Sequence, residues 1–317
     1  MYTFVYYIKL INKYYLLYIM KRRIVQHGSS SLTVTLPHAW VEKHRLKKGD
    51  ELDVEVAEDT LTLAAKTRPI HEKKLVEVTD FGVFTKNNLT HLYMLGYDEL
   101  EIQFSDEREL RDIQERVPEC IGYEIIDQKP NRVFIKSIAH TLESDFDTLL
   151  RKAFIITSEM GKEVLNAIKK KEFAKLKELR YNEGLNNKFT MACARILSKQ
   201  SRARAMQIYD VIMLLERIAD EHKYICDLLA DNKKAVKPEL IALFGKVNSY
   251  FDAFQEIFYK FGPELKKRIY LERKSLLKDA LGLVENAGGK DAVLAHHLVN
   301  IVAKTYECAG GYFASIL

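Results

Sequence analysis

Residues 20–66 place apolar side chains at every second position, a pattern typical of strands that have one buried face. A segment of about 45 residues excludes too little apolar surface from water to fold alone. Turns at Lys47–Asp50 and Glu58-Asp59 separate the strands, and a short helix is expected at 38–45. We therefore predict a β-rich module that completes its core by pairing with a second copy. The alternating apolar residues are Ile24, Val25, Leu32, Val34, Leu36, Leu52, Val54, Val56, Leu61 and Leu63.

Basic residues gather at the start of this module, although the chain as a whole is only mildly basic. It has 49 Lys and Arg against 44 Asp and Glu, a formal net charge of +5, which by itself does not indicate a nucleic-acid partner. Lys and Arg neutralise phosphates and supply affinity without reading base sequence. A solvated basic terminus is the alternative. The candidate DNA-binding residues are Lys21, Arg22, Arg23, His27, Ser29, Ser30, Ser31, Lys43 and Arg45.

Two short motifs in the module carry a family resemblance. The first comprises Gly28, Ser30 and the run Val34–Pro37, and the second is Leu46–Asp50, which reads LKKGD. Together they resemble the AbrB/MazE/SpoVT family of swapped-hairpin proteins. The resemblance implies that two chains interleave strands into one β-barrel and that basic side chains on one face contact DNA. Members often carry arginine where this chain has Thr33 and Val41-Glu42, so the DNA contacts would fall to the basic and hydroxyl residues named above.

Residues 70–140 read as a small α+β domain with strands and helices in mixed order. Gly96 is expected to end the first helix and Asp106 to cap the second. The segment shows no nucleophile–base pair, phosphate-binding loop or metal-ligand spacing, which favours a spacer or dimerisation role. The expected strands are 73–78, 99–104, 122–126 and 132–138, and the expected helices are 88–95 and 106–117.

Residues 141–317 show helical periodicity almost throughout and are rich in Ala, Leu, Glu and Lys. The runs divide into two three-helix units, at about 141–231 and 237–317, which suggests an internal duplication. The predicted helices are 145–169, 172–183, 186–230, 237–260, 263–286 and 291–317, with breaks at Asn186-Asn187, Asp231-Asn232, Gly262-Pro263 and Gly288-Gly289.

Residues 215–225 (LERIADEHKYI) occupy the same place in the first helical unit as 306–316 do in the second. The first segment resembles the signature of PhoU, the regulator of phosphate uptake. The resemblance implies a pair of three-helix bundles, each with an acidic E/D-x-x-x-D motif that often holds a metal cluster. An AbrB-like module followed by PhoU-like repeats is a known prokaryotic arrangement.

Glu216, Asp220 and Asp227 share one stripe of a predicted helix, set well away from its apolar stripe. We expect the acidic stripe to face solvent or a partner, where a cation would relieve the repulsion between like charges. Carboxylates suit Mg, Ca, Mn, Fe or Zn. In the second repeat Glu307 remains, but Gly311 replaces the second carboxylate. A solvated face, neutralised by nearby Arg217 and Lys223, is the alternative.

Three histidines lie near these motifs. His222 falls on the apolar stripe, so we expect a buried, hydrogen-bonded core residue. His296 and His297 point about 100° apart and do not chelate as an i,i+4 pair would. His296 shares its stripe with Asn300 and Glu307.

Residues 1–19 are apolar and aromatic, but Lys9 and Lys13 argue against a membrane span, and no signal-peptide cleavage site follows. We expect either a non-native or disordered extension ahead of a true start at Met20, or an interfacial membrane helix. The four cysteines show no paired or zinc-type spacing, so we expect reduced thiols in the cytoplasm. They are Cys120, Cys193, Cys226 and Cys308.

These observations together predict a cytoplasmic, multidomain regulator of phosphate uptake. It would be a homodimer or higher homo-oligomer that binds DNA through an AbrB-like module, with a helical region that senses or docks. The alternative is a non-DNA-binding, metal-binding adaptor that docks on a phosphate transporter or a signalling kinase. We expect no enzyme activity, because no buried acid–base pair or glycine-rich phosphate loop is present.

Overall fold

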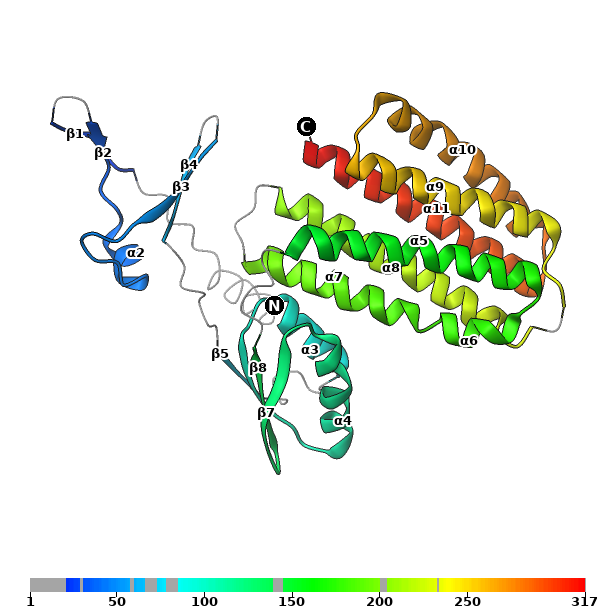
Figure 1. Ribbon diagram of the computed structural model, residues 1–317, viewed down its shortest axis with the longest axis horizontal. Coiled ribbons are helices and arrows are strands. Elements are labelled where there is room, and N and C mark those ends of the chain that lie inside the picture. The colour runs from blue at the N-terminus through cyan, green and yellow to red at the C-terminus, as the bar shows by residue number, and fades with distance from the viewer. Residues whose placement is uncertain are drawn as a thin grey trace, which may run out of the picture. The chain divides into compact units, whose positions relative to one another are not determined.

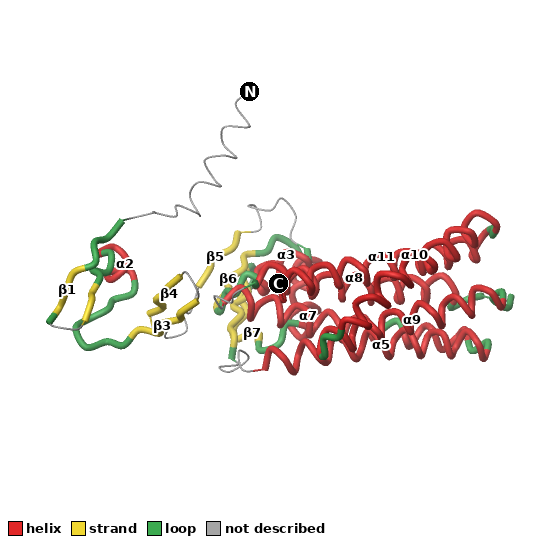
Figure 2. The backbone as a smooth tube through the Cα atoms, turned by 90° about the horizontal axis from the view of Figure 1, so that it is seen from above, coloured by secondary structure: helices red, strands yellow, loops and turns green. Residues whose placement is uncertain are grey.

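The computed structural model describes residues 21–28, 31–57, 60–65, 73–77, 85–138, 145–199, 204–232 and 234–316. The expectations for residues 1–19 and for the Glu58-Asp59 turn therefore lie outside the described residues. The chain divides into two compact units, residues 1–70 and residues 71–317. Figure 1 labels their elements, and Figure 2 colours them by type.

The first unit consists of two hairpins joined by a short helix. Strands β1 (Val25–His27) and β2 (Ser31–Thr33) are antiparallel, as are β3 (Leu52–Ala57) and β4 (Thr60–Ala65). Helix α2 (His38–Lys43) follows Pro37, whose fixed φ suits the start of a helix. Gly49 adopts a φ of +96° in the turn before β3, a conformation that favours glycine. The predicted β-rich module is confirmed, although β2 ends at Thr33 rather than at Leu36.

The second unit begins with a four-stranded sheet of order β5-β6-β8-β7. Strand β5 (Lys73–Glu77) is parallel to β6 (Glu99–Gln103), and the other pairs are antiparallel. Helices α3 (Lys86–Met94) and α4 (Glu107–Arg116) lie beside the sheet in Figure 1, with β7 (Tyr123–Lys129) and β8 (Arg132–Ser137) forming a hairpin. Gly96 has a φ of +93°, and the Asp106 side chain accepts a hydrogen bond from the Glu109 N–H, so both predicted caps are confirmed.

One face of this sheet is buried and the other carries ion pairs. Leu100 and Ile102 of β6 and Val133 and Ile135 of β8 pack in one core with α3 and α4. The alternating residues between them are only partly buried, and four of them form two ion pairs, Glu101 with Arg132 and Glu99 with Lys136. The period of two in the sequence places one set of side chains on each face.

Long helices follow, arranged as two groups of three within the described residues: α5 (Phe146–Lys170), α7 (Asn182–Lys199) and α8 (Ala205–Leu229), then α9 (Pro238–Tyr259), α10 (Pro263–Asn286) and α11 (Gly289–Ile316). A 3-10 turn (Phe173–Lys175) and the short α6 (Leu176–Leu179) connect α5 to α7. Both figures show the long helices running alongside one another. The third helices of the two groups, α8 and α11, pack together, as do the first helices, α5 and α9.

One predicted break is wrong, because Asn186 and Asn187 lie inside α7. The buried Asn186 amide donates to the Ala153 carbonyl and the Thr157 hydroxyl of α5, at 3.1 and 2.7 Å. These tertiary contacts satisfy the N–H groups of a side chain that would otherwise compete with the helix. The long run predicted over 186–230 is instead two helices, because α7 ends at Lys199 and Arg204 takes a left-handed φ of +62° before α8.

The sheet and the helices share a hydrophobic core at α7. Met191 and Ala194 of this helix belong to the same cluster as Leu89, Tyr93 and Ile102 of the sheet region. The guanidinium of the adjacent Arg195 donates to the carbonyls of Tyr93 and Tyr97 at 2.9 and 2.7 Å. This packing explains why residues 71–317 form one compact unit.

Candidate functional site

The predicted DNA-binding residues lie on the surface of the first unit. Lys21, Arg22 and Arg23 are exposed and precede β1. His27 and Ser31 face each other across the β1–β2 hairpin, and the Ser31 hydroxyl donates to the His27 carbonyl. All five side chains are available for contact with a polyanion.

Lys43 and Arg45 are also exposed, at the end of α2 and just beyond it. Arg45 takes a left-handed φ of +51°. Within the described part of the chain, no hydrogen bond or ion pair links them to the Lys21–Arg23 run. Ser29 and Ser30 lie outside the described residues.

Most of the described apolar strand positions of the first unit are exposed in a single copy, whereas Leu52 and Leu63 are half-buried. The side-chain exposures of Leu32 and Val56 reach 70% and 77%. Trp40 is only partly buried, with its ring centroid 5.0 Å from that of His44. Of the side chains that are described in this unit, only Ala65 is buried. Among the described side chains, the strands therefore have the correct alternation but form no hydrophobic core within one copy. The other exposed apolar residues are Ile24, Val25, Val34, Val54 and Leu61.

Two of the four carboxylates predicted as metal ligands, Asp220 and Asp227, are paired with separate basic side chains. Lys223 forms ion pairs with Asp220 of its own helix and with Glu183 of α7, the latter at 3.1 Å. Asp227 is paired with Arg180 at 2.6 Å, and Glu307 is exposed on α11. Among the described residues, no group of three or more His, Cys, Asp or Glu side chains is arranged to hold a metal ion.

The acidic stripe was expected to face solvent or a partner, and of its three residues only Asp227 is exposed, whereas Glu216 and Asp220 are not. Both are partly buried, because α8 packs against α7 on this side as well as against α11 on another. Burial, together with the negative charges of Asp220 and Glu183, raises the pKa of Glu216 to about 7.

Gly311, which replaces the second carboxylate of the motif in the second repeat, lies on α11 close to α8. A Cβ added there would approach within 3.4 Å of the Asp210 carboxylate and the Gln207 carbonyl.

His222 is buried, as predicted, at 2% exposure, and its ring stacks on Phe244 with the centroids 5.9 Å apart. Burial lowers the pKa of His222 to about 4, so the imidazole is neutral at pH 7. The expected hydrogen bond is not made at Nδ1, which has no partner among the described residues. The ring is therefore a neutral element of the core.

Sequence reasoning missed a polar cluster between α8 and α11. Glu221 is 5% exposed, and its carboxylate lies 2.6 Å from His297 Nδ1. It also accepts hydrogen bonds from Asn300 at 3.1 Å and from Lys304 at 2.5 Å. Burial alone would raise the pKa of Glu221, but the hydrogen bonds from His297 and Lys304 outweigh it and lower the pKa.

The spacing of the partners on α11 was the available signal for this cluster. His297, Asn300 and Lys304 are three and four residues apart and so share one face of a helix. The sequence does not show that this face meets α8 at Glu221. His296, which was grouped with Asn300 by helical spacing, has its Nε2 3.3 Å from the Asn300 amide.

Comparison with known families identifies the first unit. Residues 25–71 match the family model described as antidote-toxin recognition MazE, bacterial antitoxin. The N-terminal unit is therefore an AbrB/MazE-type domain. No curated protein and no solved structure gives a significant match to the chain. A search of the helices in the described ranges found none with the length and apolarity that a membrane crossing needs.

Proposed function

We propose that the chain is a DNA-binding regulator that acts as a homodimer through its N-terminal unit. The observation that carries the proposal is the exposure of the strand side chains, such as Val56, in a domain of the AbrB/MazE type. Domains of this type are typically dimeric and bind DNA. Pairing two copies would remove these side chains from water and supply the core that one copy lacks.

Exposed cations of the same unit support DNA as the ligand. Lys21, Arg22 and Arg23 have no carboxylate partner among the described residues, so their charges are free to neutralise phosphates. A dimer presents two copies of this run. Hydroxyl and imidazole groups at Ser31 and His27 would position the protein on the backbone rather than read bases.

The helical region would supply the sensing or docking function. Two groups of three helices and the likeness of residues 215–225 to the PhoU signature support a role in regulating phosphate uptake. We propose that the protein is cytoplasmic. Its DNA ligand would be found there, and its described cysteines are buried and free, as expected in a reducing compartment.

The test is DNA binding by the full chain at several salt concentrations. The affinity should fall steeply as salt rises, because each neutralised phosphate contributes a slope of about −0.9 in log K against log salt. Replacing Lys21, Arg22 and Arg23 with Gln should weaken binding and flatten this slope. The matched control replaces Lys169, Lys170 and Lys171, another run of three exposed cations, at the end of α5.

Equal loss of binding in both triple variants would indicate a nonspecific charge effect and refute the assignment of the N-terminal run. A dimer that binds no DNA at low salt would refute the regulator and favour an adaptor that docks on a transporter or a signalling kinase.

A further inference from the structure

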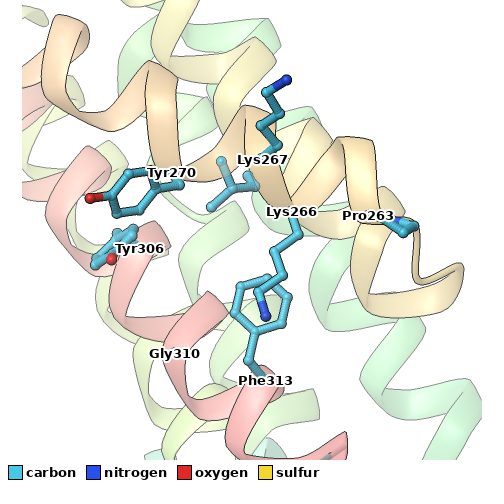
Figure 3. Close-up of a pocket in the computed structure, with 8 residues that line it drawn as sticks. Pro263, Lys266, Lys267, Tyr270, Tyr306, Gly310 and Phe313 are labelled. Atoms are coloured by element: carbon cyan, nitrogen blue, oxygen red, sulfur yellow. The ribbon is translucent and has the colours of Figure 1, made fainter.

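A pocket of about 410 Å³ lies between α10 and α11 (Figure 3). This volume is within the range of small-molecule sites, which are about 300–1,000 Å³. The walls are largely apolar: Tyr270 and Ile269 come from α10, and Tyr306 and Phe313 from α11. Gly310 also lines the pocket and leaves room because it has no side chain.

Each aromatic wall is faced by a cation of α10. Lys266 Nζ lies 4.9 Å from the centroid of the Phe313 ring, and Figure 3 shows its side chain reaching across to that ring. The Arg273 guanidinium lies 4.3 Å from the Tyr306 ring, and Lys274 Nζ lies 5.4 Å from the Tyr270 ring. The pocket is therefore apolar inside and positively charged around it.

These cations lack anionic partners within the described part of the chain. Lys266, Arg273 and Lys274 form no ion pair there, and the buried Arg273 Nε has no hydrogen-bond acceptor. Nearby cations of the same helix do have such partners, as in the pair of Arg268 with Glu272. Cation–π contacts leave the positive charge itself uncompensated.

We propose that this pocket binds an amphiphilic organic anion, a compound with a carboxylate on an apolar aliphatic or aromatic body. The body would occupy the space between Tyr270, Tyr306 and Phe313, where it gains from leaving water. The carboxylate would accept a charge-assisted hydrogen bond from Lys266, which lines the pocket, while Arg273 and Lys274 beside its aromatic walls would add positive charge. A cation of the same shape would be repelled. The small, concave pocket favours a small molecule over an acidic amphipathic helix of another protein.

The experiment measures binding of decanoate to the full chain by calorimetry, below the micelle concentration of decanoate. Decyltrimethylammonium, of the same chain length but opposite charge, is the ligand control. We expect decanoate to bind at least about tenfold more tightly than the cation. Binding at this pocket is independent of DNA binding by the N-terminal unit, so failure of one result does not decide the other.

Two variants locate the site. A Cβ at Gly310 would meet no atom within 4 Å, so Gly310→Leu should fill the pocket without strain and reduce decanoate affinity about tenfold or more. Gly282 of α10 has the same free space but does not line the pocket, so Gly282→Leu is the matched control. Lys266→Gln should also weaken binding, whereas Lys278→Gln, at an exposed position of the same helix, should not.

Equal binding of the two ligands, or unchanged decanoate affinity in both Gly310→Leu and Lys266→Gln, would overturn the proposal. So would a pocket that binds an acidic amphipathic peptide but no decanoate. Helical circular dichroism of each variant verifies that it is folded. If Gly310→Leu does not fold, the comparison of Lys266→Gln with Lys278→Gln decides.

Discussion

Arg195 of α7 and Asp98 in the turn before β6 form a buried ion pair, with Nη2 and Oδ1 2.6 Å apart and side-chain exposures of 3% and 5%. Lys199, one helical turn further on, donates to the same carboxylate at 2.6 and 2.7 Å. Arg195 also lies over the rings of Tyr93 and Tyr123. A single side chain thus joins the helical region to the sheet by charge, hydrogen bonds and ring contacts.

We predict that Arg195→Met lowers the free energy of unfolding of the second unit by about 3 kcal/mol or more, because it leaves Asp98 and two carbonyls with fewer donors in a buried place. In this variant Lys199 still neutralises part of the charge of the Asp98 carboxylate. Urea unfolding followed by helical circular dichroism measures the effect. This signal reports the second unit, since most of the described helical residues belong to it.

The matched control is Arg268→Met, which removes an exposed ion pair with Glu272 and should cost about 1 kcal/mol or less. Arg195→Lys should recover little of the loss. A guanidinium has several N–H donors in a fixed planar fork that reach two carbonyls and a carboxylate together, whereas a lysine ammonium lacks this fork. A loss as small as that of the control would contradict the role given to Arg195.

Gly161 of α5 gives a second stability prediction. A Cβ at this position would lie 2.7 Å from Asn248 Oδ1 and 2.9 Å from His222 Cε1, both on buried side chains of neighbouring helices. Gly161→Ala should therefore destabilise the protein by about 1–3 kcal/mol, although alanine favours helix. Gly282→Ala, where the space is open, should instead stabilise by up to about 1 kcal/mol. Thermal unfolding of both variants tests the opposite signs, and two stabilised variants would refute the close packing.

Local signals in the sequence predicted most elements of this fold. The breaks at Gly262-Pro263 and Gly288-Gly289 coincide with helix starts, and Asp106 and Gly96 mark caps, because each acts through its own backbone and immediate neighbours. Alternation of apolar residues likewise predicted the strands. Such features can be recognised in the sequence without knowing what the helix or strand packs against.

The failures concern partners that are distant in the sequence. Asn186 looked like a helix break, but its Nδ2 donates hydrogen bonds to α5, whose residues lie far earlier in the chain. Glu216 was expected to face solvent or a partner because its own helix left that side polar, whereas it is partly buried in a helix that packs against α7. Glu221 was overlooked for the same reason, since its partners are all on α11.

A substitution at Val56 tests the dimer proposed for the N-terminal unit. Its side chain is 77% exposed in one copy, so Val56→Glu should be harmless to an isolated chain but should place a charge in the core of a paired one. We expect sedimentation to show a dimer for the unchanged protein and monomers for Val56→Glu at micromolar concentration. Leu271→Glu, at a 54% exposed position of α10, should leave the dimer intact. A Val56→Glu variant that remains dimeric would place the interface elsewhere.

Glu216 makes the stability of the second unit depend on pH. Its pKa is about 7 in the folded chain against an ordinary 4.5, chiefly because of burial and then because of the neighbouring carboxylates Asp220 and Glu183. Between these values the unfolded chain has already lost the proton that the folded chain retains. The contribution of Glu216 to the free energy of unfolding is therefore fully present below pH 4.5 and is lost as the pH rises through about 7.

Glu216→Gln should remove this loss and stabilise the protein by about 2 kcal/mol at pH 8, with little effect at pH 4.5. His222, with a pKa lowered to about 4, acts in the opposite direction, since stability falls as the pH drops below its ordinary 6.5. The difference in unfolding free energy between Glu216→Gln and the unchanged protein isolates the first contribution, because His222 is common to both. Glu285→Gln, at an exposed position, should show no such pH-dependent difference. A Glu216→Gln effect that is the same at pH 4.5 and pH 8 would contradict the raised pKa.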